Sequence, residues 1–183
     1  MPINFSTVKT ALVSWCSLVV GSSIPVIIYE PNAPRPNSQY VTINISSITS
    51  YGQDWANSLS TALGEVQMKG DRLFTVGLQC YGGDTLTLME NIRTSLQKQT
   101  VLDGLRTNGI AFYQAFTIND ITELVDSRFE KRAQLDVLFG IGQVYLDTPG
   151  FFDTVEVQEF IKNVDSEIIF TDTITIESPD ASP

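Results

Sequence analysis

Acidic side chains are the main groups in this chain that could carry out acid–base chemistry. The 183 residues include 21 acidic and 11 basic side chains, two cysteines and no histidine. A Ser-His-Asp triad, a Cys-His pair and a histidine-ligated zinc site are therefore excluded. Glycosidase-type catalysis needs two defined carboxylates, and the sequence singles out no such pair. A carboxylate-dependent hydrolase is thus a remote alternative.

Two short patterns resemble ligand sites, but each has a simpler interpretation. Asp120, Glu123 and Asp126 offer oxygen ligands, yet their spacing suits a solvated helix face better than a calcium loop. Gly82-Gly83-Asp84 precedes a predicted helix, and its aspartate is better suited to cap the helix than to neighbour a bound anion. We therefore expect no catalytic residue, no cofactor and no metal.

A cluster of charged residues before a predicted long strand is the best candidate for contact with another protein. Arg128, Lys131 and Arg132 stand there with Glu130. A surface salt-bridge face and a partner-contact patch both remain open. The candidate interaction residues, which include three acidic side chains further along the chain, are Arg128, Lys131, Arg132, Asp136, Glu167 and Asp172.

The negative charge is concentrated near the C-terminus. Residues 1–150 hold 13 acidic and 10 basic side chains, whereas residues 151–183 hold 8 acidic side chains and Lys162 alone. We predict a domain at 1–150 and an acidic C-terminal strand or arm extension at 151–183. An arm that adds strands to a neighbour and an edge strand with a frayed end both fit this pattern.

The apolar segments do not indicate export or membrane insertion. Residues 11–23 are amphipathic at helical spacing, unlike the core of a signal peptide. No run of 18 apolar residues occurs, so no membrane span is expected. Cys16 and Cys80 lie among apolar residues and are predicted to be reduced and buried. These features predict a soluble, intracellular chain.

Periodicity and turn residues predict a succession of short elements. Gly70-Asp71 is expected to form a tight turn, 52–63 a loop, and 119–125 one helical turn. The predicted helices are 6–20, 84–99 and 100–108. The predicted strands are 25–29, 40–51, 65–69, 72–80, 110–116, 132–146, 154–157 and 168–176.

The order of several of these pieces resembles the neck terminator family of tailed bacteriophages. Tyr40-Val-Thr-Ile43 and Arg132-Ala-Gln-Leu-Asp-Val137 carry the resemblance. Between them stand Tyr81-Gly-Gly-Asp84 before a helix, and the segment 101–110. The similarity covers residues 40–147 and extends to residues 5–30.

The resemblance implies an α/β (α+β) fold with a mixed, mostly antiparallel sheet, flanked by two or three helices. It also implies a homohexameric ring that caps the tail tube, stops its growth and docks the neck. The implied partners are further copies of the chain, the tail tube protein, a neck or head-completion protein and, in a contractile tail, the sheath. Genomic DNA would pass through without specific binding, and the protein would reside in the virion. Another ring-forming head- or tail-completion protein is the neighbouring alternative.

Overall fold

The computed structural model describes residues 3–32, 34–58, 65–125, 128–149, 154–162 and 168–177. The chain forms two compact units, each described by itself. One comprises Met1–Trp55 and Lys69–Val144, and the other Ala56–Met68 and Tyr145–Pro183. The predicted boundary near residue 150 stays a prediction. Within the described residues, no helix is both long and apolar enough to cross a membrane.

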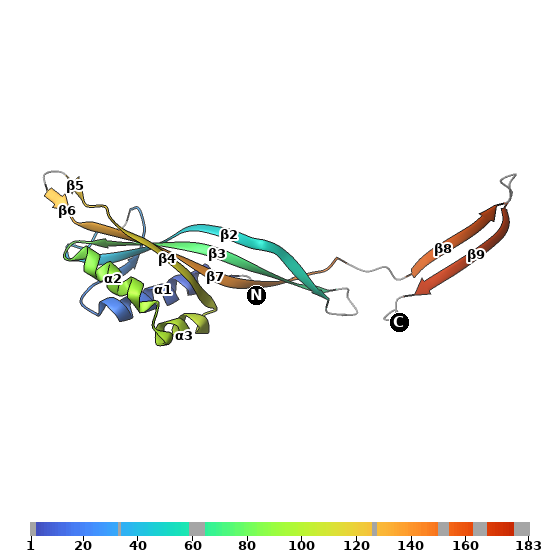
Figure 1. The fold of residues 1–183 in the computed structure, drawn as a ribbon, viewed down its shortest axis with the longest axis horizontal. Helices are drawn as coiled ribbons and strands as arrows, with labels where there is room; N and C mark the ends of the chain where they lie inside the picture. Colours follow the sequence, from blue (N-terminus) through green and yellow to red (C-terminus); the bar gives the residue numbers. More distant parts are fainter. Residues whose placement is uncertain are drawn as a thin grey trace. The chain divides into compact units, whose positions relative to one another are not determined.

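The main sheet has five strands in the order β1-β2-β3-β7-β4 (Figure 1). β1 runs parallel to β2, and β4 runs antiparallel to β7. Separate two-stranded sheets join β5 with β6 and β8 with β9. The helices are α1 (Phe5–Val20), α2 (Thr85–Ser95) and α3 (Gln99–Thr107). The strands are β1 (Val26–Ile28), β2 (Tyr40–Ser58), β3 (Val66–Tyr81), β4 (Ile110–Asp120), β5 (Glu123–Val125), β6 (Arg128–Glu130), β7 (Arg132–Asp147), β8 (Thr154–Lys162) and β9 (Ile168–Glu177). The predicted α+β class, a mixed and mostly antiparallel sheet with flanking helices, is confirmed.

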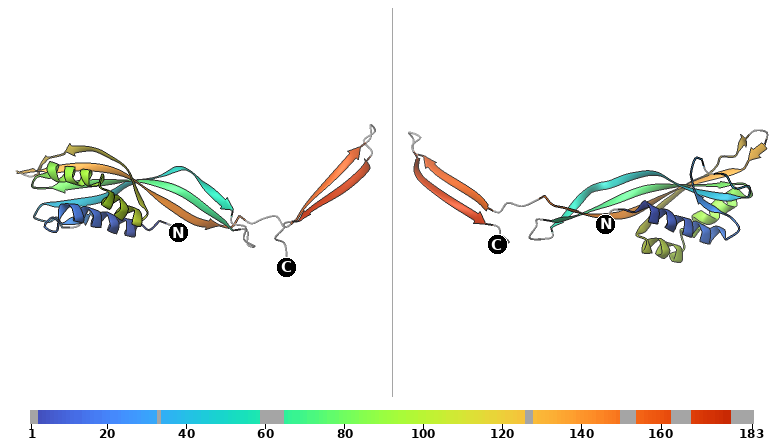
Figure 2. Two further views of the ribbon diagram at one scale, coloured as in Figure 1. Left: turned by 60° about the horizontal axis from the view of Figure 1, so that its bottom comes forward. Right: turned by 180° about the vertical axis from the view of Figure 1, so that it is seen from behind.

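The core lies between one face of the main sheet and the three helices (Figures 1 and 2). Alternate residues of a strand point to the same face, and in β3 and β7 these alternate residues are buried and apolar. They are Phe74, Val76, Leu78 and Cys80, followed by Ala133, Leu135, Val137 and Phe139. The intervening positions carry polar side chains such as Gln79, Gln134 and Asp136. The sheet therefore has an apolar face under the helices and a polar opposite face.

The ends of α1 lie within one residue of the helix predicted over 6–20. The Asn4 side chain accepts hydrogen bonds from the backbone N–H groups of Ser6 and Thr7. Gly21 ends the helix with φ of +82°, a conformation that glycine adopts without a Cβ clash. On the buried side, Trp15 Nε1 donates to Ser95 Oγ at 3.0 Å and joins α1 to α2. Cys16, also on this face, and Cys80 of β3 are free and buried, as predicted.

We expect Asn4→Ala to lower the free energy of unfolding by about 1 kcal/mol, because two N–H groups of the first turn lose their acceptor. Chemical denaturation with a far-UV circular dichroism readout measures this change. Asn4→Ser is the matched control, because serine is also a good N-cap and should retain most of the stability. Equal stability of the alanine variant and the native chain would contradict this role for Asn4.

The predicted turn at Gly70-Asp71 is wrong, because β3 runs through both residues. A Cβ at Gly70 would meet the Asp54 carboxylate, which would then have to shift. That carboxylate forms a two-pronged ion pair with Arg72, with both N···O distances at 2.6 Å. The predicted loop from Gly52 onward is wrong for residues 52–58, because β2 continues to Ser58. Residues 59–63 of that predicted loop lie outside the described residues.

Three further local predictions differ from the structure. The predicted helical turn at 119–125 is wrong, because β4 extends to Asp120 and Glu123–Val125 pairs with β6. The second helix ends at Ser95, not near residue 99. The third begins at Gln99, where no side chain caps it. Asp103 accepts hydrogen bonds from the side chains of Gln99 and Arg106 within that helix.

Candidate functional site

Arg132, the first residue of β7, is the centre of an ionic network. Its Nε lies 3.0 Å from Oε2 of Glu130, and its Nη1 forms a second ion pair with Glu123. Only 13% of the Arg132 side chain is exposed. The buried Nε and Oε2 atoms form no aligned hydrogen bond, so their contact is an ion pair only. Arg35 approaches the same Glu130 oxygen at 3.6 Å and shares its charge.

Two stacked tyrosines lie beside this network. Tyr40 begins β2 and Tyr81 ends β3, and their ring centroids are 4.5 Å apart with an angle of 5° between the planes. The Arg132 guanidinium lies 4.8 Å from the centroid of the Tyr81 ring, within cation–π range. Tyr81 Oη donates to Gln79 Oε1 at 2.6 Å. Burial, more than any nearby charge, raises the pKa of the Tyr40 phenol, so this group stays neutral near pH 7.

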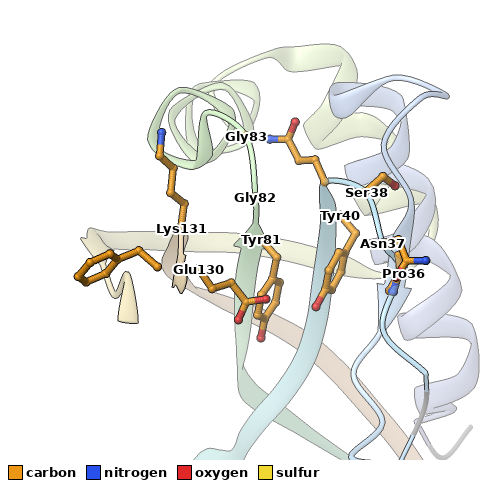
Figure 3. A pocket seen from close by; sticks show the side chains of 11 residues that line it. Pro36, Asn37, Ser38, Tyr40, Tyr81, Gly82, Gly83, Glu130 and Lys131 are labelled. Atoms are coloured by element: carbon orange, nitrogen blue, oxygen red, sulfur yellow. The ribbon is translucent and has the colours of Figure 1, made fainter. Parts of the chain in front are cut away.

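Tyr40, Tyr81, Glu130 and Arg132 are called the Tyr–Arg cluster below. It borders an open pocket of about 560 Å³ that is also lined by the loop 36–39 and by Gly82, Gly83 and Lys131. Figure 3 shows the two rings face to face, Glu130 beside Tyr81, and Lys131 pointing away from the rings. The charges of Glu130 and Arg132 are already balanced by neighbouring side chains. The geometry therefore suits the joining of strand ends better than acid–base chemistry.

The Gly82-Gly83-Asp84 segment beside the pocket is a helix cap. The Asp84 carboxylate accepts a hydrogen bond from the Thr87 backbone N–H at the start of α2. Hydrogen bonding to Thr87, first to its side chain and then to its backbone N–H, lowers the pKa of Asp84 below its ordinary value, and Lys131 contributes a smaller effect. Gly83 adopts φ of +65°, and a Cβ there would lie 2.6 Å from Oε1 of Gln39. The expected capping role is confirmed.

We expect Asp84→Ala to destabilise the protein near pH 7 and to have a smaller effect at acidic pH. The folded-state pKa of Asp84 is depressed, so its contribution is present above the unfolded-state value and is lost as pH falls through the lower folded-state value. Thermal unfolding of both proteins from pH 7 to below pH 3.8 measures the difference. A constant difference across this range would show that the carboxylate charge is not involved.

Three of the six predicted interaction residues lie in or next to β7. Lys131 and Arg132 are adjacent at the start of β7, and Asp136 lies on the same strand face as Arg132. Asp136 is half-buried, accepts hydrogen bonds from Gln134, and packs against Gly77, where a Cβ would lie 3.3 Å from its carboxylate. The structure thus assigns Arg132 and Asp136 contacts within their own chain, while Lys131 is exposed.

The remaining predicted residues are less closely defined. Arg128 belongs to β6, but its side chain lies outside the described atoms, and Glu167 lies outside the described residues. Asp172 is exposed on β9, opposite Glu159 of β8, and accepts a hydrogen bond from the Thr173 backbone N–H. Whether any of the six contacts another molecule stays a prediction.

The described acidic residues that were considered as metal ligands have hydrogen-bond or ion-pair partners within the chain. Asp120 accepts hydrogen bonds from the backbone and hydroxyl of Thr122, and Glu123 pairs with Arg132. Asp126 lies outside the described residues. In the described part of the chain, no group of three or more acidic or cysteine side chains is placed to hold a metal ion.

Comparison with known proteins identifies the family. The model of a family described as "Phage neck terminator protein" matches residues 6–173. The chain belongs to this family. The predicted resemblance is therefore confirmed, and the match extends beyond residues 40–147, where the motifs were recognised. No match is found among curated proteins.

Solved structures also show similarity to this neck terminator, and fifteen chains match it. One is described as "Cryo-EM Structure of an Extracellular Contractile Injection System, PVC sheath/tube terminator in extended state". It has a TM-score of 0.46 and 11% sequence identity, over 90% of this chain and 65% of that one. The neck terminator therefore spans slightly less than two thirds of that protein's length.

The Tyr–Arg cluster connects the ends of three strands within this chain. It joins the start of β2, the end of β3 and the start of β7, three points far apart in the sequence. Glu130 and Arg132 were recognised in the sequence as members of a charged cluster, but Tyr40 and Tyr81 were not predicted to be their partners. Each tyrosine stands at the end of a predicted strand, and no local pattern indicates that these strand ends meet.

Proposed function

We propose that this neck terminator forms a homohexameric ring on the last tier of the tail tube. The ring stops polymerisation of the tube protein and offers its other side to a neck or head-completion protein. The observation that carries this proposal is the family match over residues 6–173, which includes nearly the whole chain. In a contractile tail, the sheath is a further partner. The role is structural, without catalysis.

The subunit has features that suit a cap. A protein that ends a polymer needs one surface that matches the polymer and another that differs from it. The helices cover only one face of the main sheet in the described part of the chain, and the other face carries polar and ionic side chains. Identical subunits close a ring through heterologous contacts between two different surfaces. This two-faced subunit supports such an arrangement.

The net negative charge of the chain supports the proposal that DNA passes through the ring without binding to it. Each chain carries a net charge of −10, so six copies would carry about −60 before screening by counterions. We expect the channel wall to be acidic and to repel phosphates. A structure of the assembled ring tests this, and a basic channel would contradict it.

Native mass spectrometry and negative-stain imaging of the purified protein test the ring itself. A species of six chains and images of closed rings are expected, either alone or on the ends of purified tail tubes. A protein that stays monomeric in solution and does not decorate tube ends would contradict the proposal.

A further inference from the structure

The outer edge of β2 is unprotected over most of its length. β1 pairs with β2 only at Val41–Ile43, and no other strand lies along this edge among the described residues (Figures 1 and 2). Natural sheets protect long edges with charges, prolines or bulges. Between Tyr40 and Gln53 the chain has no charged residue and no proline. The edge at Ile45–Tyr51 is therefore a template for another strand.

The backbone groups available on this edge follow from the pairing with β1. The Val41 N–H donates to the carbonyl of Pro25, and the Ile43 carbonyl accepts from the Tyr29 N–H. In a strand, the N–H and C=O groups of alternate residues point to the same side. Ile45, Ser47, Thr49 and Tyr51 therefore direct their backbone groups outward. The Ser47 and Thr49 side chains are exposed.

The β8–β9 ribbon is a separate two-stranded sheet, and no core covers its described side chains. All its described side chains are exposed, including Val155, Val157 and Ile174 at 43–52%. An isolated two-stranded ribbon is marginally stable in water. Here Glu159 also stands directly opposite Asp172, a like-charge pair that weakens the ribbon further.

The distribution of charged residues indicates which strand edge can pair with the ribbon. Residues 151–183 carry a net charge of −7, from 8 acidic side chains and Lys162. Pairing of two ribbons would place these charges together, whereas the uncharged β2 edge adds no repulsion. A chain with both a donor ribbon and an acceptor edge can make the heterologous contact that a ring requires.

We propose that the β8–β9 ribbon of one copy adds to the free β2 edge of a second copy, next to Ile45–Tyr51. This inference rests on the proposed ring and names the contact that joins its subunits. The main-chain hydrogen bonds between the two strands supply affinity. The exposed apolar side chains of the ribbon become less exposed to water.

Cross-linking between copies tests the pairing in the full-length protein. Thr49→Cys chains are mixed with Gln158→Cys or Thr173→Cys chains, representing β8 and β9, and treated with a short bismaleimide. Native Cys16 and Cys80 are buried, and burial raises the pKa of both thiols, so they should not react. We expect a covalent dimer containing one chain of each kind. Leu18→Cys, an exposed position on α1, is the control and should give no such dimer with the ribbon variants.

A backbone variant provides an independent readout. Ser47→Pro with Thr49→Pro removes two outward N–H groups and leaves the β2–β3 pairing in place, whereas Ser47→Ala with Thr49→Ala retains them. We expect the proline pair to weaken the hexamer by about tenfold or more in dissociation concentration relative to the alanine pair. Far-UV circular dichroism verifies that both variants are folded.

The outcomes separate this inference from the proposed function. A hexamer that tolerates both prolines and gives no β2–ribbon cross-link overturns the pairing and leaves the ring intact. Products that link only two ribbons also overturn it. If the native chain forms no hexamer, the proposed ring fails, whatever the cross-links show.

Discussion

Phe139→Ala is expected to lower the free energy of unfolding by about 3–5 kcal/mol. Phe139 is fully buried in β7 and is the centre of an aromatic group. Its ring lies 5.7 Å from that of Phe74, 5.9 Å from Trp15 and 6.2 Å from Phe112. Truncation would leave a cavity between the sheet and α1 and would remove three ring contacts at once.

Urea denaturation at one fixed protein concentration measures this effect, because association with other copies would also change apparent stability. Phe129→Ala is the matched control. That ring is 77% exposed, so its removal should change stability by less than about 0.5 kcal/mol. A small effect at Phe139, or similar effects at the two sites, would show that the apolar face of the sheet is not the core.

Arg132→Leu is expected to lower the free energy of unfolding by about 2–3 kcal/mol, because the ion pairs and the cation–π contact are lost together. The change leaves the Glu130 carboxylate in a largely buried position without its nearest cation. The Tyr81 ring also loses the guanidinium that lies over it. Thermal and urea unfolding measure the loss.

A second substitution shows whether the loss of stability comes from an unpaired charge or from lost packing. Adding Glu130→Gln to Arg132→Leu should restore part of the stability, because the uncompensated carboxylate is then removed. Arg106→Leu is the control for an exposed ion pair. Arg106 and Asp103 are each 60% exposed, and the expected loss is below about 1 kcal/mol. If Arg132→Leu costs no more than Arg106→Leu, the Tyr–Arg cluster does not hold the strand ends together.

Local sequence signals predicted the elements whose causes are themselves local. Asn4 and Gly21 mark the ends of α1, and its apolar stripe faces the core. The alternation of buried residues in β7 follows directly from the pattern Ala133, Leu135, Val137. Each of these features depends on residues within a few positions of one another, which explains why periodicity and capping rules identify them.

The errors arose where a distant residue determines the local structure. Gly70 was interpreted as part of a turn, but it lies within β3, where the Asp54 side chain of the neighbouring strand approaches it closely. The stretch at 119–125 carries helix-capping residues, yet pairing of Asn119 with Gln134 extends β4 as a strand. Long-range pairing overrides local propensity in both cases.

The candidate site was predicted only in part for the same reason. The charged residues before β7 were recognised from composition, but the stacking of Tyr40 on Tyr81 depends on the strand order of the sheet. The hydrogen bond between the Asp136 carboxylate and Gln134 was not predicted either, and contact of Asp136 with a partner stays a prediction. The position of a residue within a strand does not determine which residue of another strand its side chain will contact.

We propose that this protein ends tail tube growth and prepares the tail for joining to the head. Electron microscopy of particles from a phage lacking the protein tests this proposal, with a control in which the native chain is supplied in trans. We expect tails that are overlong or remain unjoined to heads, and restored length and joining in the control. Tails of normal length joined to heads in the absence of the protein would contradict the account.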